Sequence, residues 1–540
     1  MWEQHYTPIA DSVGLSALVA GLPVFVLLYL LGVARKPAWI AAVYGLGAAA
    51  VVAAAVYRMP VVQLVASISY GAAFGLFPIG WVVFWAVVLY RSLVVTGKFE
   101  IIKDSVGSLT SDRRVQALLI AFAFGAFIEG AAGFGTPVAV AAAMLAGLGF
   151  SPFYAAGICL LANTAPVAFG SIGTPLLTLN KITGLPLADL SANVGRICAP
   201  VSTIVPAYLV LVMGGWKALR GVLPAALVCG VAFGLTQFLV SSYIGPELTD
   251  ILSSLASIGA LVALLTVWKP ADTFQLEGEL HNDKVKRHKA AEVFHAWSPY
   301  FLLVVLVLVW GQSDVKAFLN RFTMNINWPG LHNQILRVPP VEPKAIPYAA
   351  TYAWQLVSAS GTACMIAAFL SSFILRLPLS RFAEVVAETA RQLAFSMLTI
   401  AAVLALAFLM NYSGATVTLG LAFATTGVLF PFFSALLGWL GVFLTGSDTS
   451  ANALFGNLQV VTAKSLGLNP TLMAASNSSG GVMGKMISLQ SIAVAAAATG
   501  MAATDEARLF RFTLRHSIFL ASLLGLITVF YAYVAPTWVR

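Results

Sequence analysis

Long apolar runs dominate the chain, and polar residues gather in short segments between them. A helix that crosses a membrane needs about 20 apolar residues. Five shorter or Gly/Pro-interrupted segments, where we expect half-spans or hairpins, are 60–75, 133–150, 431–446, 450–466 and 471–500. The runs that predict full spans are 12–33, 38–57, 76–96, 115–129, 153–170, 196–214, 221–241, 248–268, 297–312, 350–373, 393–410, 416–437 and 516–536. Together they predict about 12 to 16 spanning or half-spanning helices.

Composition narrows the fold class further. Of the 540 residues, 59% are apolar and only 9% are charged, whereas a soluble domain carries about 25% charged residues. So few charges cannot cover a water-facing surface, which excludes a soluble enzyme, a disordered chain and a fibrous protein. The mean hydropathy of +0.89 agrees. We therefore predict an all-α polytopic membrane protein.

The basic residues predict an orientation. The net charge is +9, but the lysines and arginines lie in short loops between apolar runs, which is typical of cytoplasmic loops and not of a nucleic-acid surface. If all clusters are cytoplasmic, both termini lie outside and 313–347 is an external loop. These clusters are Arg35 and Lys36; Lys98, Lys103, Arg113 and Arg114; the basic residues of 269–295; Arg376 and Arg381; and Arg508, Arg511 and Arg515.

A charged loop, 269–295, divides the chain into two apolar halves, 1–268 and 296–540. Each half has a long uncharged run that abuts one isolated acid, Glu129 in the first and Asp448 in the second. Similar motifs then recur in order: FGTPVAV, a proline and NTAPVAFG, then FGNLQVV, a proline and NSSGGVMG. The order predicts two copies of one unit, as in membrane proteins built from inverted repeats with broken helices.

The segment EGAAGFGTP at 129–137 cannot be an uninterrupted lipid-facing helix. Glycine costs about 1 kcal/mol and proline about 3 kcal/mol in a helix interior, and broken backbone inside a membrane persists only where protein or water satisfies it. The segment is therefore expected to line a cavity, where the freed amides of Gly133, Gly135 and Thr136 would attract an anion. The alternative is a tight crossing of helices through small residues, which leaves Glu129 unexplained.

Glu129 is the single residue that indicates a functional site most specifically. A charge at the bilayer centre costs several kcal/mol, so such a residue faces a pathway or a partner. The functional interpretation is a proton carrier or coupling site. The alternative is a structural hydrogen bond to nearby broken backbone, or a buried ion pair.

Two further segments supply neutral hydrogen-bonding groups. NTAPVAFGSIGTP at 163–175 offers Asn163 and Thr164 on an interrupted helix, which suits a small polar solute or, alternatively, hydrogen bonds between helices. TGSDTSANALFGN at 445–457 offers Asp448, Thr449 and Asn452. Its Ser-Asp-Thr start is typical of a surface helix N-cap, and the functional alternative is a second broken segment that faces the first.

The last segment of this kind is SNSSGGVMGKMISLQS at 476–491, in which Lys485 lies near Ser478 and Ser479. A lone ammonium in an apolar run is a partner for a carboxylate, either that of a substrate or that of Asp448. The third possibility is that Lys485 extends to the membrane interface.

Motifs of soluble catalysis are absent from the sequence, since it has no GxSxG, HExxH or P-loop. The six histidines are scattered, and the four cysteines lie singly in apolar runs, so we expect no metal site, no cofactor and no enzymatic activity. The first residues lack the basic region of a cleavable signal, and we expect the first apolar run to be a membrane helix.

Four motifs closely resemble the lactate permease family: GAFIEGAAGFGTPVAV at 125–140, ANTAPVAFGSIGTP at 162–175, GSDTSANALFG at 446–456 and GKMISLQSIAVA at 484–495. The resemblance extends from about residue 10 to the C-terminus. It implies a multi-pass symporter of the prokaryotic cytoplasmic (inner) membrane that takes up L-lactate, D-lactate and glycolate with protons. It also implies an ion-transporter-like fold with inverted repeats and elevator-like movement.

Combining residues and resemblance gives a hypothesis for the mechanism. A 2-hydroxymonocarboxylate is ionised at neutral pH, and moving its charge inward against the potential costs about 2.3 kcal/mol per 100 mV. Glu129 is the leading proton site and Asp448 the second. The anion cradle comprises Gly133, Gly135, Thr136, Asn163, Thr164, Ser478 and Ser479, with Lys485 as countercharge and with Thr449 and Asn452 facing the cavity. Sodium coupling, an anion channel and a membrane-embedded enzyme are the alternatives.

Overall fold

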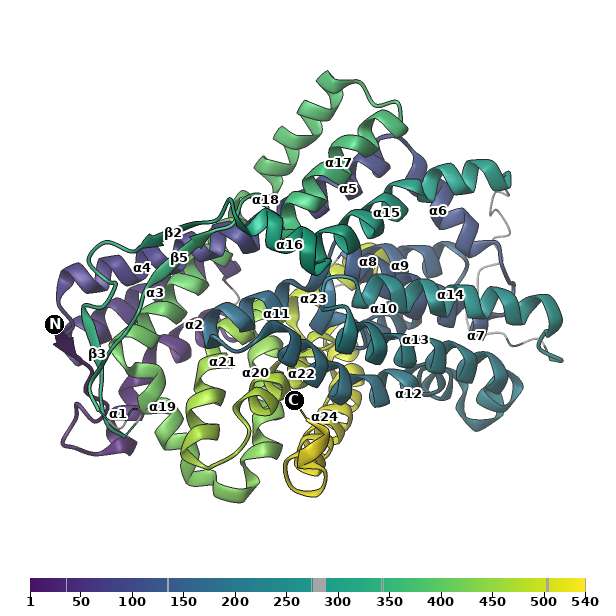
Figure 1. Ribbon diagram of the computed structural model, residues 1–540. Coiled ribbons are helices and arrows are strands. Elements are labelled where there is room, and N and C mark those ends of the chain that lie inside the picture. Colours follow the sequence, from purple (N-terminus) through teal and green to yellow (C-terminus); the bar gives the residue numbers. More distant parts are fainter. Residues whose placement is uncertain are drawn as a thin grey trace.

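The computed structural model describes residues 1–34, 36–133, 136–272, 274, 288–340, 342, 344–501 and 505–539, and these are predominantly helical (Figure 1). The helices of the first half are α1 (Val13–Ala20), α2 (Leu22–Gly32), α3 (Ala38–Ala55), α4 (Val61–Phe74), α5 (Trp81–Val95), α6 (Lys98–Gly107), α7 (Arg113–Gln116), α8 (Gly125–Ala131), α9 (Thr136–Gly147), α10 (Pro152–Ala162), α11 (Gly170–Thr183), α12 (Leu187–Gly221), α13 (Leu223–Tyr243) and α14 (Thr249–Val267). Short π-helical segments, Gly75–Gly80 and Ala117–Phe124, join α4 to α5 and α7 to α8.

The helices of the second half are α15 (Ala290–Gly311), α16 (Ser313–Asn320), α17 (Ser360–Ile374), α18 (Leu379–Ser413), α19 (Ala415–Phe423), α20 (Phe430–Thr445), α21 (Asp448–Ser465), α22 (Pro470–Lys485), α23 (Leu489–Thr499) and α24 (Glu506–Val529). Five short strands are β1 (Trp2–Glu3), β2 (Met324–Asn327), β3 (Ile335–Arg337), β4 (Ile346–Pro347) and β5 (Thr351–Trp354). β1 pairs in parallel with β3, β3 pairs antiparallel with β4, and β2 pairs antiparallel with β5.

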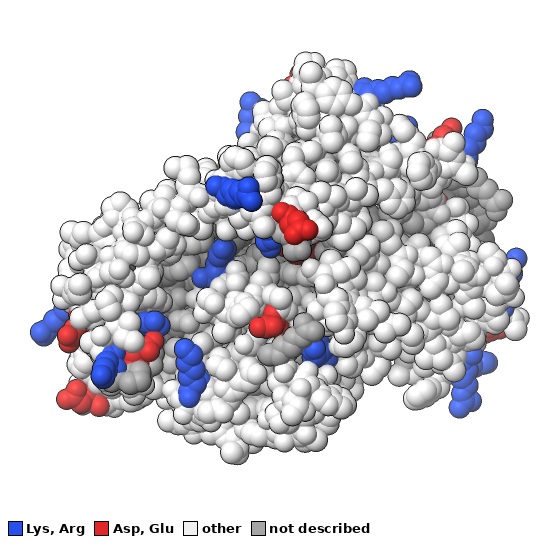
Figure 2. Space-filling view, in the orientation of Figure 1, with Lys and Arg blue, Asp and Glu red and all other residues white. Residues whose placement is uncertain are grey.

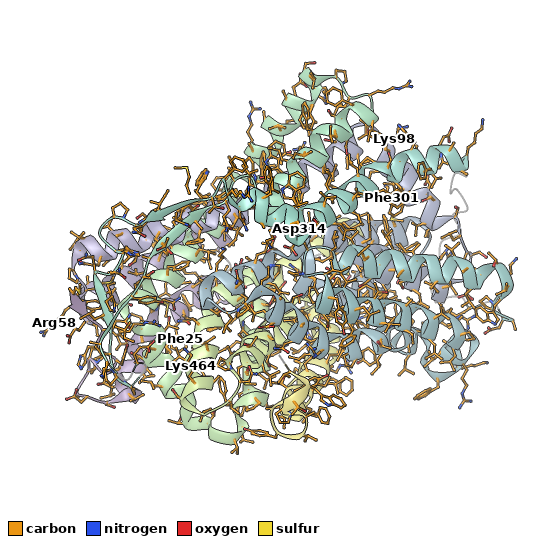
Figure 3. The ribbon with its side chains drawn as sticks, in the orientation of Figure 1. Phe25, Arg58, Lys98, Phe301, Asp314 and Lys464 are labelled. Carbon is orange, nitrogen blue, oxygen red and sulfur yellow. The ribbon has the colours of Figure 1, made fainter. Side chains whose placement is uncertain are left out.

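The number of membrane helices agrees with the prediction. Among the described residues, 12 helical stretches are long and apolar enough to cross a membrane, and the bent pair Pro152–Ala162 and Val167–Thr183 raises this to 13. The chain is thus an all-α, multi-pass membrane protein. Side chains such as that of Phe25 are exposed on its outside (Figure 3), as expected of a surface that contacts lipid.

The segment 350–373 differs from its prediction as a span. Its first residues form β5, in which Tyr352 is buried and Thr351 is exposed, and α17 begins only at Ser360. The alternation of buried and exposed side chains is that of a strand. The remaining 15-residue helix is too short to cross the hydrocarbon core alone.

Contacts between loops place the predicted cytoplasmic residues at one end of the bundle. His288 Nε2 lies 2.8 Å from Asp104 Oδ2, and His295 Nε2 lies 2.9 Å from Ile374 O, two residues before Arg376. The Arg508 guanidinium lies over the Phe153 ring. The Arg113 guanidinium lies over the Phe150 ring, on the same turn before α10. The described residues of four of the five basic clusters therefore share one end, and Figure 3 places Arg58 and Lys98 toward opposite ends.

Both termini lie at the other end. The β1–β3 pairing fixes the N-terminus beside the segment that was predicted to be the external loop. α24 runs antiparallel to α22, since Ser517 contacts Met483 and Thr528 contacts Ser476. The end of α21 lies near the N-terminus, because Thr462 of α21 donates to Gly420 O of α19 and Thr418 of α19 donates to Tyr6 O. α22, which follows α21 after a short turn, therefore starts at that end. Figure 2 shows the charged side chains gathered toward the two ends and along a central hollow, with a wide uncharged surface elsewhere.

Two helical hairpins lie at the centre of the bundle, α9–α10 in the first half and α21–α22 in the second. The helix that follows each hairpin packs on the first arm of the other one: α11 on α21, and α23 on α9. The next helices repeat the exchange, with α12 on α22 and α24 on α10. Such reciprocal packing is what two copies of one unit produce when they face each other about a pseudo-two-fold axis.

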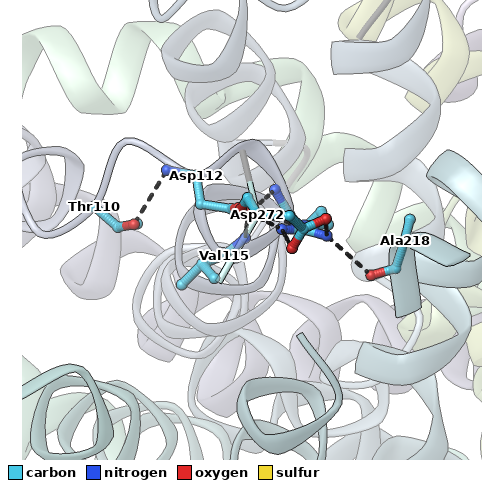
Figure 4. A network of polar contacts seen from close by, with 6 residues as sticks. Thr110, Asp112, Val115, Ala218 and Asp272 are labelled. Atoms are coloured by element: carbon cyan, nitrogen blue, oxygen red, sulfur yellow. Dashed lines mark hydrogen bonds and ion pairs between the residues drawn. The ribbon is translucent and has the colours of Figure 1, made fainter. Parts of the chain in front are cut away.

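A buried arginine, Arg114, lies at the end of the bundle that carries the basic residues (Figure 4). Arg114 donates to Asp112 Oδ2 at 2.7 Å, to Asp272 Oδ1 at 2.9 Å and to Ala218 O at 3.3 Å. These hydrogen bonds join α7, the end of α12 and the segment after α14. The hydrogen bonds from Arg114 hold the pKa of the Asp272 carboxyl below its usual value.

Small residues let α4 and α18 touch through their backbones. A Cβ on Gly71 would lie 2.6 Å from Ala405 Cα, and one on Gly75 would lie 2.7 Å from Ala401 Cα. The spacing of these glycines is that of the GxxxG motif of membrane helices. The first and second halves therefore interlock here, since α4 belongs to one and α18 to the other.

We expect Gly71→Ala to lower the thermal unfolding temperature, because backbone atoms cannot yield as a flexible side chain would and overpacking costs about 1–3 kcal/mol. Gly47→Ala is the control, since no atom lies within 4 Å of a Cβ there. Thermal unfolding of the two purified variants in detergent measures the difference. Equal melting temperatures would contradict the close approach of α4 and α18.

Candidate functional site

Each predicted break is present in the chain. In the first half, α8 ends at Ala131 and α9 begins at Thr136, with Gly133 at a φ of +62° that favours glycine. In the second half, α20 ends at Thr445, Gly446 adopts a φ of +72°, and the Ser447 hydroxyl caps α21 by accepting from Ser450 N. The Ser447 N-cap that the sequence indicated is thus formed, but it lies inside the bundle.

A third break contains strained backbone. α10 ends at Ala162, and Ser171, Ile172 and Gly173 all have positive φ. A left-handed residue other than glycine costs about 1–2 kcal/mol, and a β-branched one is rarer still. The Ser171 hydroxyl donates to Ala132 O at 3.0 Å, so the turn is held against the first break.

Glu129 lies at the end of α8 and is 4% exposed. Its carboxylate packs on Gly170, where a Cβ would lie 2.6 Å from Glu129 Oε1. Asn163 is the neighbouring polar side chain and Lys485 is the nearby cation. No described atom hydrogen-bonds Glu129 Oε2 or either polar atom of the Asn163 side chain, so this corner of the site has unused hydrogen-bonding capacity.

Asp448 is the first residue of α21 and is 3% exposed. Its Oδ2 accepts from Ser478 Oγ at 2.6 Å and from Asn452 Nδ2 at 3.2 Å. Its Oδ1 faces Gly481 and has no hydrogen-bond partner among the described residues. The side chain is therefore oriented by two donors and keeps one free oxygen.

A chain of amides supports Asp448. Asn477 Nδ2 donates to Asn452 Oδ1 at 2.9 Å, and Gln459 Nε2 donates to Asn477 Oδ1 at 3.0 Å. Asn452 Nδ2 also lies 3.2 Å from Pro175 O in α11. Buried polar networks rigidify a core when their members are satisfied, so this network fixes the second-half site against the first half.

Lys485 is the last residue of α22 and is 8% exposed. Its ammonium donates to Gly446 O at 2.7 Å, in the break before α21. No ion pair within 4.0 Å joins it to a carboxylate among the described residues, although its charge reaches both Glu129 and Asp448. The cation thus stands near two acids and is bonded to neither.

The structure brings most of the sequence-predicted site residues together. Glu129, Asn163 and Lys485 form one side, and Asp448, Asn452 and Ser478 form the other. Ser479 is buried next to the Cys198 thiol, and its hydroxyl has no partner with hydrogen-bond geometry among the described atoms. Gly133 lies beside Ser171 in the first break.

Other predicted residues are not joined to this group. The Thr164 hydroxyl donates to Leu161 O at 2.8 Å, within its own helix. Among the described residues, no side-chain hydrogen bond links Thr136 or Thr449 to the site. Gly135 lies outside the described residues.

The glycine-rich motif of the second half differs from its counterpart. NTAPVAFG lies in a break, but NSSGGVMG lies within α22, and the break follows Lys485. Gly480 and Gly484 face Ala435 O and Trp439 O of α20. They permit a close helix crossing, which explains why this segment remains helical.

Sequence reasoning missed two residues of this region. Asp250, in the first turn of α14, is buried beside Glu129. Gln237 of α13 donates to Ala165 O in the third break at 3.0 Å. A signal existed for Asp250, since it is the only charged residue of 249–267, but it stands at the start of a span, where acids are common.

The fold and the site together define a class: a multi-pass helical membrane protein in which broken helices of two packed units surround isolated buried charges. The model of the L-lactate permease family matches residues 16–535. The chain belongs to that family, whose name is that of a transport protein.

Two curated relatives extend over nearly the whole chain. An L-lactate permease of Bacillus subtilis is 47% identical, with 98% of this chain and 98% of that protein covered. The glycolate permease GlcA of Escherichia coli is 46% identical, with 99% and 98% covered. Among solved structures, that of the Neisseria gonorrhoeae MtrF efflux pump has a TM-score of 0.45 at 13% identity and covers 87% of this chain and 84% of its own, a likeness too low to build on.

Proposed function

We propose that this protein imports L-lactate, and also D-lactate and glycolate, by proton symport across the cytoplasmic (inner) membrane of a prokaryote. The observation that supports this most directly is the set of buried polar atoms without partners in this region, Glu129 Oε2, the Asn163 amide, Asp448 Oδ1 and Ser479 Oγ, with the charge of Lys485 reaching both acids. Buried polar groups are normally hydrogen-bonded, so a site that leaves several unpaired is suited to a polar solute. The relatives, an L-lactate permease and a glycolate permease, supply the substrate class.

The chemistry of a 2-hydroxymonocarboxylate matches this set. Its carboxylate needs a cation and N–H or O–H donors, which Lys485, Asn163 and Ser479 offer. Its hydroxyl is both donor and acceptor, so it can pair with a carboxylate oxygen and with an amide. In our proposal the substrate carboxylate replaces Gly446 O as the acceptor for the Lys485 ammonium. The substrate hydroxyl then donates to Asp448 Oδ1.

The proton is assigned to Glu129, with Asp448 as the second site. A net charge inside the bilayer is costly, and a substrate anion that enters with one proton leaves the net charge of the site unchanged. Because the proton cancels the substrate charge, the membrane potential no longer opposes uptake. The pH gradient then supplies the driving force.

Movement is assigned to the two repeat units, in the halves 1–268 and 296–540. Each unit contributes a hairpin, and the packing of α11 on α21 and of α23 on α9 supports a site at their junction. A displacement of the hairpins relative to α4, α5 and α18 would expose the site alternately to either end. We assign the end that carries both termini to the outside.

Proteoliposomes test the function directly. An inward proton gradient is expected to drive accumulation of labelled L-lactate above equilibrium, and D-lactate and glycolate are expected to compete with it. A sodium gradient at constant pH is expected to drive none. Accumulation that follows sodium would support a sodium symporter instead, and rapid equilibration without accumulation would support an anion channel.

We expect Glu129→Gln to abolish proton-driven accumulation while exchange of labelled for unlabelled lactate continues. The amide keeps the shape of the acid but does not bind and release a proton near neutral pH. Glu384→Gln is the matched control, since Glu384 pairs with Arg381 at the surface. Uptake and exchange are measured in the same vesicles. Full accumulation by the Glu129 variant would remove this residue from coupling.

We expect Lys485→Ala to weaken lactate binding roughly ten- to hundredfold, since a hydrogen bond to a charged group is worth about 1.5–3 kcal/mol. Lys464→Ala is the control, because Lys464 is the exposed cation of the neighbouring helix α21 (Figure 3). Equilibrium binding of labelled lactate to the detergent-solubilised variants measures the change. An unaltered affinity would make Lys485 a structural residue.

A further inference from the structure

Asp250 is a buried carboxyl that the proposed mechanism does not use. It lies in the first turn of α14 and is 1% exposed. Neither of its carboxylate oxygens has a hydrogen-bond partner among the described residues. An acid that merely stabilises a helix N-terminus accepts from the freed backbone N–H groups. Asp250 does not, so that structural role does not account for it.

The position of Asp250 is set by the first break. A Cβ on Gly130 would lie 2.7 Å from Asp250 Cβ, so the backbone next to Glu129 is in contact with this side chain. Glu129 is the charged group whose field acts on Asp250. Two buried acids, each with an oxygen that lacks a partner, thus stand side by side on α8 and α14.

The other charges around the pair are few. α13 and the π segment Ala117–Phe124, which also pack on α14, contain no charged residue, and α11 contains only Lys181. The Cys198 thiol of α12 is close enough to Asp250 and to Asp448 for both charges to act on it. Lys485 acts on Glu129 but is not among the groups that act on Asp250. When two carboxylates are adjacent, as Glu129 and Asp250 are, their negative charges repel each other, so the pair is more stable when one proton is bound between them.

The acid nearest to Asp250 along the chain lines an open cavity. Glu247, one turn earlier, lines a cavity of about 430 Å³ together with Lys181, Lys316 and Gln312. The cavity lies beside α16, which contributes Lys316 and Asn320 to its lining and whose Asp314 is labelled in Figure 3. Asp250 follows Glu247 by three residues in the chain, and its side chain lies against the backbone next to Glu129.

We propose that Asp250 is a proton-transfer residue that passes a proton between the cavity at Glu247 and Glu129. In the loading direction, the Asp250 carboxylic acid gives its proton to the Glu129 carboxylate, and a hydronium ion or the acid form of Glu247 in the cavity protonates Asp250 again. This inference rests on the proposed proton symport and adds a residue to its proton path.

The test compares Asp250→Asn with Asp189→Asn in proteoliposomes. Asp189 is a first-turn acid of α12, so it controls for the loss of an acid at a helix start. We expect the Asp250 variant to slow proton-driven lactate uptake roughly tenfold or more, as loss of a positioned proton donor does. Lactate exchange at equal pH and the melting temperature should stay within twofold and within a few degrees, and Asp250→Glu should restore part of the uptake.

Three outcomes separate the possibilities. Slowed uptake with retained exchange, and with normal behaviour of the Asp189 variant, supports the proposal. Unchanged uptake and unchanged proton flux into the vesicles overturn it, and so does an equal loss of uptake, exchange and thermal stability, which would make Asp250 structural. If the unmodified protein itself shows no proton-driven uptake, the proposed function fails first, and the proton path fails with it.

Discussion

Interrupted backbone inside a membrane has to find its hydrogen-bond partners within the protein, and this constraint organises the whole molecule. Each break lies against an element of the other unit or a neighbouring helix. The breaks follow Ala131, Ala162, Thr445 and Lys485. The Ser171 hydroxyl and the Lys485 ammonium each satisfy a carbonyl that a break has freed. The buried charges and the breaks therefore occur together because each compensates for part of the cost of the other.

The reciprocal packing of the hairpins gives the two units different tasks despite their common plan. On the first-half side Glu129 and Asn163 retain unpaired atoms, whereas on the second-half side Asp448 is oriented by Ser478, Asn452 and the amides behind it. A loosely bonded acid is suited to exchanging a proton, and an oriented one is suited to holding a solute in one pose. The near-repeat in the sequence conceals this difference.

Much of this arrangement could be predicted from the sequence, because Gly, Pro and isolated acids in apolar runs are local signals. They identified the breaks, Glu129, Asp448 and Lys485. The rest depends on contacts between distant segments. Gly480 was interpreted as part of a polar segment, but it accommodates Ala435 of α20, and Asp250 acquires its significance only because α8 lies across it. The strand Thr351–Trp354 was hidden in an apolar run because its alternation is only four residues long.

The short N-terminal strand has a consequence for how the chain is made. Gln4 donates to the carbonyl of Tyr412, 408 positions later, and β1 pairs with β3. Contacts so far apart in sequence are slow to form, and during synthesis these partners do not yet exist when the first helices enter the bilayer. The N-terminal residues therefore remain undocked until most of the protein has been inserted, so that their docking marks the completion of assembly.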